Sequence, residues 1–425
     1  MIRHRIGLAG AVKERRGGVS QLKVIVDGEE SAALNYNFLT GPVKRGDLLL
    51  LNTTALHLAL GSGGYHFVEH NYSCPPPRFK GSGHIMKLCY TPWQMRVLSC
   101  EEDEAGFGAG LARFKSLEKT AVLIGELHSM VTPAVAVLKY YRPSCRIAYI
   151  MTDGTALPLA YSRNIAGLQE RGLLSGTVTC GHAFGGQLEA VNVYSALAAC
   201  RTLVEADFII LGPGPGSIGT ASSLGFSGME AGDHVNRVNA LGGVPLFIPR
   251  ISFAERRRRH YGISHHSLTA LALAALTPAL LALPLMPPAQ LRLCLGQLAG
   301  RALMRRHNLQ VLQPPPLERI MQQLGLDPPE SMGRSYREDP YFFDAAAAAA
   351  VAALRLAGPA SEEEGEEEYG EAGKRTLGGD TFIHLSLPGK DCKSPAGPDP
   401  LPGRQRARFA GNRGTSRRRG HPGAR

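Results

Sequence analysis

Polar side chains that could catalyse a reaction or hold a ligand follow each of five apolar runs in the middle of the chain. The runs, each with the polar residues after it, are 121–125 (Glu126, His128), 146–151 (Asp153), 177–180 (His182), 206–211 (the glycine-rich stretch 212–220) and 244–248 (Arg250). Carboxylates and imidazoles act as general acids and bases or hold metal ions. Glycine-rich turns and arginines bind anions. The pattern therefore indicates a chemically capable site.

The spacing of these runs predicts how the polar residues are positioned. Apolar runs of four to six residues, separated by helix-length amphipathic stretches, are typical of a mainly parallel sheet flanked by helices. In such open α/β sheets, ligands bind beyond the carboxyl ends of the strands. We therefore expect the polar residues to line a single pocket at that edge of the sheet.

Glu126 and His128 are two positions apart at the end of the first run, so they share one side while strand geometry persists. They could bind one metal ion, or pair a base with the acid that orients it. The alternative is that His128 caps the next helix.

Asp153 could be a general base, a ligand of a ribose hydroxyl, or a turn residue whose side chain forms a hydrogen bond with its own backbone.

His182 stands among three glycines in the segment GHAFGG, residues 181–186. Glycines allow close approach of the backbone to a ligand, and a following helix would present free N–H groups to an anion. We expect a helix over residues 187–204, with Glu189 in its first turn. We predict catalytic roles for His182 and Asp153.

The stretch GPGPGSIGT contains the pattern G-x-G-x-x-G directly after a predicted strand. As a dinucleotide fingerprint it is weak, since prolines flank its glycines and no helix clearly starts within it. It also lacks the Lys-Ser/Thr pair of a nucleotide P-loop. A backbone nest for one phosphate or carboxylate is the better interpretation. The candidate ligand-binding residues are Gly212, Gly214, Gly216, Gly219, Thr220 and Arg259.

The densest cluster of functional side chains is RRRRHYGISHH, residues 256–266. Ser264 is a good helix N-cap, which would place His265 and His266 in a first helical turn, where neutral imidazole is favoured. Neutral imidazole binds metals and accepts protons. Because adjacent helical residues point about 100° apart, we expect one of the two to enter the site.

Within this cluster, His260 is a candidate metal ligand together with Glu126 and His128, and His265 and His266 are candidate catalytic residues. The arginines could hold a phosphate through paired hydrogen bonds. The alternative is a solvated basic loop.

Composition narrows the class of protein. The 425 residues are 44% hydrophobic and 20% charged, as in a globular protein. The net charge of +11 permits phosphate-bearing partners, but one tryptophan and no regular alternation of aromatic and basic residues disfavour nucleic acid. The eight cysteines form no CxxC pair, which argues against a zinc ribbon or a disulfide framework.

Membrane insertion is also not expected. The N-terminal apolar core is too short for a signal peptide. Residues 268–288 are uncharged and long enough to span a bilayer, but Pro278 and Pro284 interrupt them, and a buried helix fits their first part. We therefore expect no stable membrane insertion and a cytoplasmic location.

The chain divides into three predicted parts. Residues 1–105 read as a small all-β barrel or sandwich, because short strands alternate with turn signals. Residues 116–357 form the α/β domain that carries the candidate site, and its last helix begins at Asp339-Pro340. Residues 358–425 are acidic, then rich in proline and glycine, then basic, and we expect them to be disordered.

Several segments resemble one bacterial family. They are GGYHF, GHIMKL-YTP, GELHS, MTDG-ALPLA-S, T-CGHAFGG-LEAVNVYS, GFSG, RISFA with R-RH-G-SHH, and MGR---EDP-FF-AA. Together they resemble a family catalogued as a domain of unknown function (number 3866), over roughly residues 1–357. The resemblance implies membership but supplies no activity.

Two hypotheses about function follow from these residues. The first is an enzyme that hydrolyses or transfers a group of a small anionic substrate; a phosphorylated substrate and the assistance of a divalent metal ion are both compatible with these residues. The second is a non-catalytic regulatory protein that binds a nucleotide-like ligand at the same edge of the sheet. The number of titratable histidines favours the enzyme. The pattern does not specify the metal or the oligomeric state.

Overall fold

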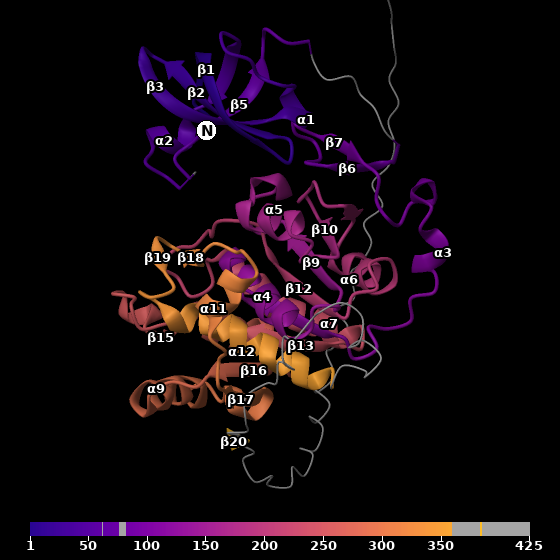
Figure 1. The fold of residues 1–425 in the computed structure, drawn as a ribbon, viewed down its shortest axis with the longest axis vertical. Coiled ribbons are helices and arrows are strands. Elements are labelled where there is room, and N and C mark those ends of the chain that lie inside the picture. The colour runs from indigo at the N-terminus through magenta and orange to yellow at the C-terminus, as the bar shows by residue number, and fades with distance from the viewer. Residues whose placement is uncertain (62, 76–81, 359–382, 385–425) are drawn as a thin grey trace, which may run out of the picture. The chain divides into compact units, whose positions relative to one another are not determined.

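The fold was determined as a computed structural model that describes residues 1–61, 63–75, 82–358 and 383–384 (Figure 1). The predicted disordered tail, 358–425, lies outside the described residues except for Gly358 and the two-residue strand β20 (Ile383–His384), which pairs with β17 (Asn308–Leu312).

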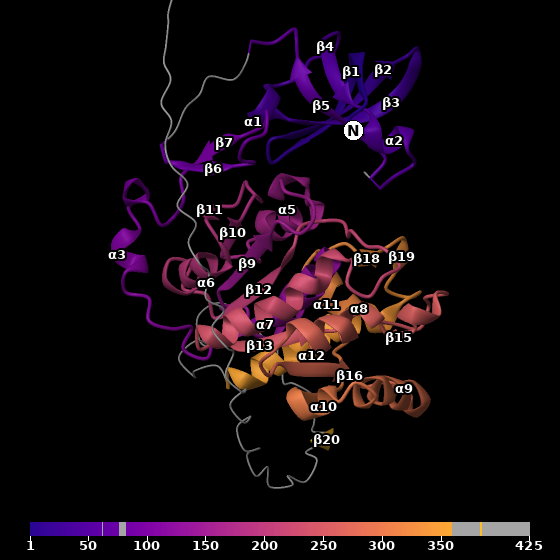
Figure 2. The same ribbon diagram turned by 180° about the vertical axis from the view of Figure 1, so that it is seen from behind.

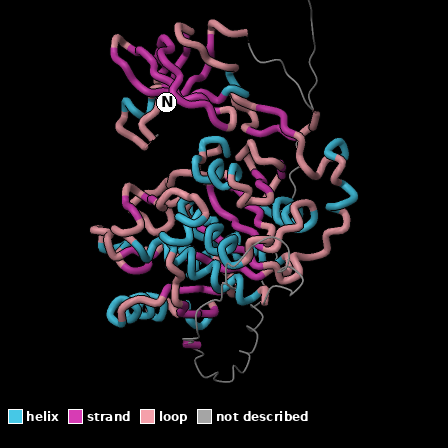
Figure 3. The backbone as a smooth tube through the Cα atoms, in the orientation of Figure 1, coloured by secondary structure: helices cyan, strands magenta, loops and turns pink. Residues whose placement is uncertain are grey.

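The N-terminal module is a closed five-stranded barrel, which is one of the two architectures that the sequence predicted. Its strands are β1 (His4–Arg16), β2 (Val19–Val26), β3 (Glu29–Tyr36), β4 (Leu48–Asn52) and β5 (His66–Asn71), in the order β1-β2-β3-β5-β4. Alternate residues of β2, such as Leu22 and Val24, are buried inside the barrel, as the period of two in a strand requires. In Figure 3 this module is mostly magenta strand, with the short helices α1 (Asn37–Thr40) and α2 (Thr54–His57).

A separate two-stranded hairpin follows the barrel. Its strands are β6 (Ile85–Lys87) and β7 (Met95–Val97), which pair only with each other in the described sheet topology. The Lys87 ammonium is buried and lies 2.6 Å from a Glu189 carboxylate oxygen. Ser99 forms a parallel bridge with Glu189 as well. The hairpin is therefore joined to the edge of the main sheet. Next come the 3₁₀ turn η1 (Asp103–Ala105) and the helix α3 (Gly108–Leu111).

The main sheet has eight parallel strands, in agreement with the predicted fold class. They are β8 (Ala121–Gly125), β9 (Ile147–Thr152), β10 (Gly176–Cys180), β11 (Leu188–Ala190), β12 (Phe208–Pro213), β13 (Val244–Ile248), β16 (Leu280–Pro284) and β17. Their order is β11-β10-β9-β12-β8-β13-β16-β17. All five residues of β8 are buried, because helices cover both faces of a parallel sheet.

Helices flank the sheet on both faces (Figures 1 and 2). The helices α4 (Val131–Tyr141) and α12 (Pro340–Leu356) pack together, and α12 crosses β8, β13 and β16. The helices α6 (Val193–Thr202) and α7 (Glu230–Ala240) pack together and contact β8 to β10 and β13. The chain moves in opposite directions along the sheet through α4 and through α7, so right-handed crossovers place these helices on opposite faces.

The remaining elements are short. The helices are α5 (Arg163–Glu170), α8 (His265–Thr269), α9 (Pro288–Ala299), α10 (Leu303–Arg306) and α11 (Leu317–Gln323). The 3₁₀ turns are η2 (His128–Met130), η3 (Leu159–Tyr161), η4 (Ser227–Met229) and η5 (Arg258–His260), and η6 (Ala270–Ala274) is a π-helix. The strand pairs are β14 (Ile251–Ser252) with β15 (Gly262–Ile263) and β18 (Glu330–Ser331) with β19 (Arg334–Ser335).

Two predicted elements differ from the structure. The expected helix over residues 187–204 begins at Val193, where Asn192 forms a capping box, and the residues before it form β11. Glu189 lies in β11, where its carboxylate pairs with Lys87. The apolar run 268–288 divides into the end of α8, the π-helix η6 and the buried strand β16. Among the described residues, no helix is both long and apolar enough to cross a membrane.

Candidate functional site

A cavity of about 320 Å³ opens beyond the carboxyl ends of β8, β12 and β13. The strand β8 lies between the other two, where the chain order along the sheet reverses, so the cavity occupies the topological switch point of the fold. Its lining residues are Glu126, Leu127, residues 217–221 and 226–228, Arg250, Arg257, Arg259, His260, His266 and Met332.

Glu126, directly after β8, is the buried carboxylate of this cavity, with 4% of its surface exposed. Ser267 donates a hydrogen bond of 2.5 Å to Oε2 and accepts one from the Arg250 backbone N–H at 2.9 Å. Within the described part of the chain, Oε1 has no hydrogen-bond partner. Burial raises the pKa of Glu126 to about 7, against the opposing effects of Ser267 and Arg250. Near neutral pH the group can therefore give or take a proton.

Arginine side chains supply positive charge to the same cavity. Glu255 lies 2.7 Å from Arg257 and 3.4 Å from the buried Arg250. The hydrogen bond from Arg257 lowers the pKa of Glu255 to about 2, so this carboxylate stays ionised and offsets part of the charge. Arg259 also lines the cavity and is exposed. The balance of these charges favours an anionic ligand.

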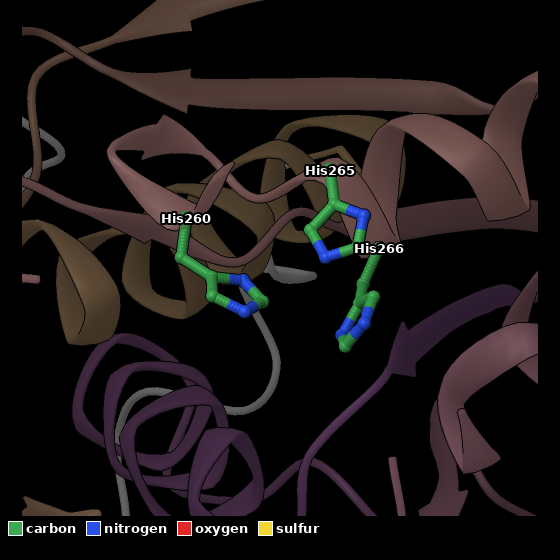
Figure 4. Close-up of side chains that lie close together, drawn as sticks. All are labelled: His260, His265 and His266. Carbon is green, nitrogen blue, oxygen red and sulfur yellow. The ribbon is translucent and has the colours of Figure 1, made fainter. Parts of the chain in front are cut away.

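Three histidines, His260, His265 and His266, gather beside the cavity (Figure 4). Their ring centroids are 4.2 to 4.9 Å apart. One ligand atom from each lies within 4.8 Å of the others. Both adjacent histidines of α8 belong to this cluster, and of these two His266 lines the cavity, which matches the expectation that one of the pair enters the site. His260 comes from η5, and its ring packs against both.

Local hydrogen bonds position these rings. The N-cap Ser264 accepts a hydrogen bond from the His266 backbone N–H, and its Oγ lies 2.8 Å from Nδ1 of His260. His266 stacks on Phe226 with ring centroids 3.8 Å apart and planes 7° from parallel. Burial, reinforced by Arg250, lowers the pKa of His260 to about 3.

The other two rings are neutral for a similar reason. Burial, reinforced by His265, lowers the pKa of His266 to about 4. Burial, reinforced by Arg259, lowers the pKa of His265. All three rings are neutral at physiological pH, which is the form that binds metals.

Comparison with known proteins identifies the family. The family described as "Protein of unknown function (DUF3866)" matches residues 32–350. The chain belongs to this family. The match includes every residue that lines the cavity. Neither the search of curated proteins nor the search of solved structures found a match.

In this family member, His128 lies away from the cavity that Glu126 lines. Its Nε2 is 2.6 Å from Ser162 Oγ, and its Nδ1 is 3.1 Å from both the Pro213 carbonyl oxygen and the Tyr149 hydroxyl. It contributes to the wall of a second cavity, of about 330 Å³. Burial lowers the pKa of His128 to about 4. Both ring nitrogens are therefore engaged in hydrogen bonds, although the spacing from Glu126 suggested a shared metal.

Asp153 and His182 contact each other but do not line the Glu126 cavity. The Asp153 carboxylate accepts the His182 backbone N–H at 2.9 Å, and Nδ1 of His182 accepts the Leu88 N–H at 3.2 Å. These residues follow β9 and β10, and β12 separates β9 from β8 in the sheet. The structure therefore does not bring all the predicted residues into a single pocket.

The glycine-rich stretch contributes only its later part to the cavity. Gly219 and Thr220, two of the candidate ligand-binding residues, line it. At Gly212, a Cβ would lie 2.9 Å from the Gly125 carbonyl oxygen, and at Gly214 it would lie 2.3 Å from that of Ala156. These two glycines permit close backbone packing, and Gly216 takes a φ of +98°. Backbone packing at Gly212 and Gly214 and the positive φ of Gly216 therefore explain these three glycines without a ligand.

Sequence reasoning missed three contributors to the site. Ser267 bonds Glu126, Phe226 stacks on His266, and Met332 lines the cavity. Phe226 and Met332 fall within the segments GFSG and MGR, which carry the family resemblance. The sequence therefore marked these segments but did not indicate what the two residues do at the site. Ser267 lies one residue after the His265–His266 pair, and its pairing with Glu126 spans 141 positions, which no local pattern reveals.

Proposed function

We propose that the protein is an enzyme that hydrolyses or transfers a group of a small anionic, phosphorylated substrate, with the assistance of a divalent metal ion. The observation that carries this proposal is Glu126. A buried carboxyl with an unpartnered oxygen and a pKa near 7, facing a cavity, is suited to general acid–base catalysis.

The cavity supports the choice of substrate class. Its volume of about 320 Å³ suits a small metabolite. Arg250, Arg257 and Arg259 line it, and guanidinium groups bind phosphate oxygens through paired hydrogen bonds. Gly219 and Thr220 add backbone from the loop that follows β12. Nucleic acid is not part of this proposal.

The described cysteines support a cytoplasmic location within the same proposal. Seven cysteines of the described residues form no disulfide, and five of these are buried. Free thiols of this kind persist in reducing compartments.

The test is Glu126→Gln, compared with Glu170→Gln at an exposed position of α5. The purified full chain is assayed for phosphate release from a panel of small phosphate monoesters. We expect the wild type to turn over at least one ester, and Glu126→Gln to lower kcat by about 10²-fold or more with little change in KM. Glu170→Gln should match the wild type.

The alternative, a regulatory ligand-binding protein, predicts a different outcome. It predicts that the wild type binds phosphate compounds in calorimetry but releases no phosphate from any ester. That result, or full activity of Glu126→Gln, would contradict the proposed enzyme.

A further inference from the structure

We propose that His260, His265 and His266 bind one divalent first-row transition metal, zinc in preference, with an open coordination position for the anionic substrate. Three imidazoles and one open position are the donor set of many catalytic zinc sites. Metal binding stands on the histidine geometry alone, whereas its coupling to the anion rests on the proposed function.

The first observation is the arrangement of the rings. Figure 4 shows the three imidazoles grouped around one common space, and one ligand atom of each lies within 4.8 Å of the others. Nitrogens at about 2.0–2.1 Å from a tetrahedral ion are about 3.3 Å apart. Metal binding would therefore draw these atoms together by up to about 1.5 Å.

The second observation is independent of the spacing. Nε2 of His265 and Nε2 of His266 are both buried, and neither has a hydrogen-bond partner among the described residues. A buried polar atom without a partner destabilises the fold by about 1–3 kcal/mol, so such atoms are rare unless a ligand satisfies them. A metal ion would satisfy both nitrogens at once.

The third observation concerns the groups behind the rings. Ser264 Oγ lies 2.8 Å from Nδ1 of His260. With Nδ1 donating to this hydroxyl, the lone pair of Nε2 is free to bind a metal. A hydrogen bond from the other ring nitrogen commonly orients a metal-binding histidine in this way. Phe226 fixes the plane of His266 by stacking on it.

The surrounding charges indicate how the metal would be used. Arg250 lines the same cavity as His260 and His266, and so does Arg259. The two guanidinium groups repel a divalent metal ion that binds alone, but they attract the complex of that ion with an anion. An anion that touches both the metal and the guanidinium groups should therefore increase the affinity for the metal, and the metal should increase the affinity for the anion by the same factor.

The experiment measures metal binding by the full chain after treatment with a chelator. Zinc is titrated by calorimetry, and cobalt by its visible absorption, which reports tetrahedral coordination. The variants are His265→Gln and His266→Gln, both at half-buried positions, with His57→Gln at an exposed position of α2 as the matched control. Circular dichroism checks that each variant is folded.

We expect one metal ion per chain, and an affinity at least about 100-fold lower in each site variant. His57→Gln should bind as the wild type does. Unchanged affinity in both folded site variants, or no metal bound by the wild type, would overturn the metal site.

A second titration uses methylphosphonate as the anion. We expect it to raise zinc affinity about threefold or more in the wild type and to have less effect in Arg259→Gln. If zinc binds at the histidines and methylphosphonate has no effect, the metal site holds but its coupling to the anion is overturned. If methylphosphonate binds but zinc does not, the catalytic role of Glu126 on an anionic substrate can survive, whereas metal assistance at these three histidines is overturned.

Discussion

Two buried carboxyl groups of this protein show why burial alone does not mark a catalytic residue. Glu126 and Asp344 both have raised pKa values because burial disfavours their charge. Glu126 faces a cavity and leaves one oxygen without a partner among the described residues. Asp344 lies within α12 and accepts a hydrogen bond of 2.9 Å from the Tyr336 hydroxyl. The cavity distinguishes the two groups.

Asp344 gives a prediction for stability against pH. Burial raises its pKa to about 6, above its value in an unfolded chain, so the folded state keeps the proton longer. The stability that this provides is complete below about pH 4 and is lost as the pH rises through about 6. Asp344→Asn removes the charge and keeps the acceptor for Tyr336.

We therefore expect Asp344→Asn to raise the free energy of unfolding by about 2 kcal/mol at pH 8 and to change it little near pH 4. Urea denaturation at both pH values measures this. An equal effect at the two pH values would show that the substitution acts through packing.

At the residue scale, the sequence predicted which types of residue form the site better than it predicted which of them lie together in one cavity. Glu126, His260 and His266 all line the cavity. Glu126 follows the end of β8 and His266 follows the N-cap Ser264, as local patterns indicate, whereas His260 lies in the turn η5. Asp153 and His182 satisfy the same local rule. They lie apart from the cavity because β12 inserts between β8 and β9, and strand order is a property of long-range pairing.

At the scale of elements, continuous apolar runs predicted β8 and β13 to the residue, because burial on both faces leaves no ambiguity. The strand β16 was not predicted, because the sequence assigned a helix only to the first part of the run 268–288 and no element to residues 280–284. The π-helix η6 was also not predicted. It follows α8 directly, and so it lies next to two of the proposed metal ligands.

The contact between α7 and η6 leads to the second prediction. A Cβ at Gly232 would lie 2.5 Å from the Ala270 carbonyl oxygen and 2.6 Å from the Ala274 Cβ. Gly232→Ala should therefore push η6 away, lower the free energy of unfolding by about 1–3 kcal/mol, and weaken zinc binding by displacing His265 and His266.

The matched control is Gly296→Ala in α9, where a Cβ would meet open space. It should stabilise the protein by up to about 1 kcal/mol and leave zinc binding unchanged. Thermal melting and zinc titration measure both variants. Equal zinc affinity in Gly232→Ala and the wild type would show that η6 does not set the position of the histidines.

At the scale of the whole molecule, composition and turn signals predicted the order of the parts. The expected boundary at residue 105 placed β6 and β7 with the barrel, because short strands all look alike in sequence. Lys87 of β6 instead pairs with Glu189 of the main sheet, 102 positions away in the sequence. Cys100 also packs in the core of the α/β region. We therefore propose that the structural boundary lies between β5 and β6.

This boundary predicts how two fragments differ in stability. In the fragment 83–358, Lys87 still donates to the Thr179 and Ala183 carbonyl oxygens and to Glu189. In the fragment 106–358, Glu189, whose side chain is 13% exposed, loses this cation, and the loss of one partner of a largely buried ion pair destabilises a fold by about 3–5 kcal/mol. We expect 83–358 to unfold cooperatively in urea and 106–358 to be less stable by at least about 3 kcal/mol. Lys87→Met in 83–358 isolates the ion pair and should reproduce most of the loss. Equal stability of the two fragments would contradict a boundary between β5 and β6, and the β6–β7 hairpin would then be assigned to the barrel module.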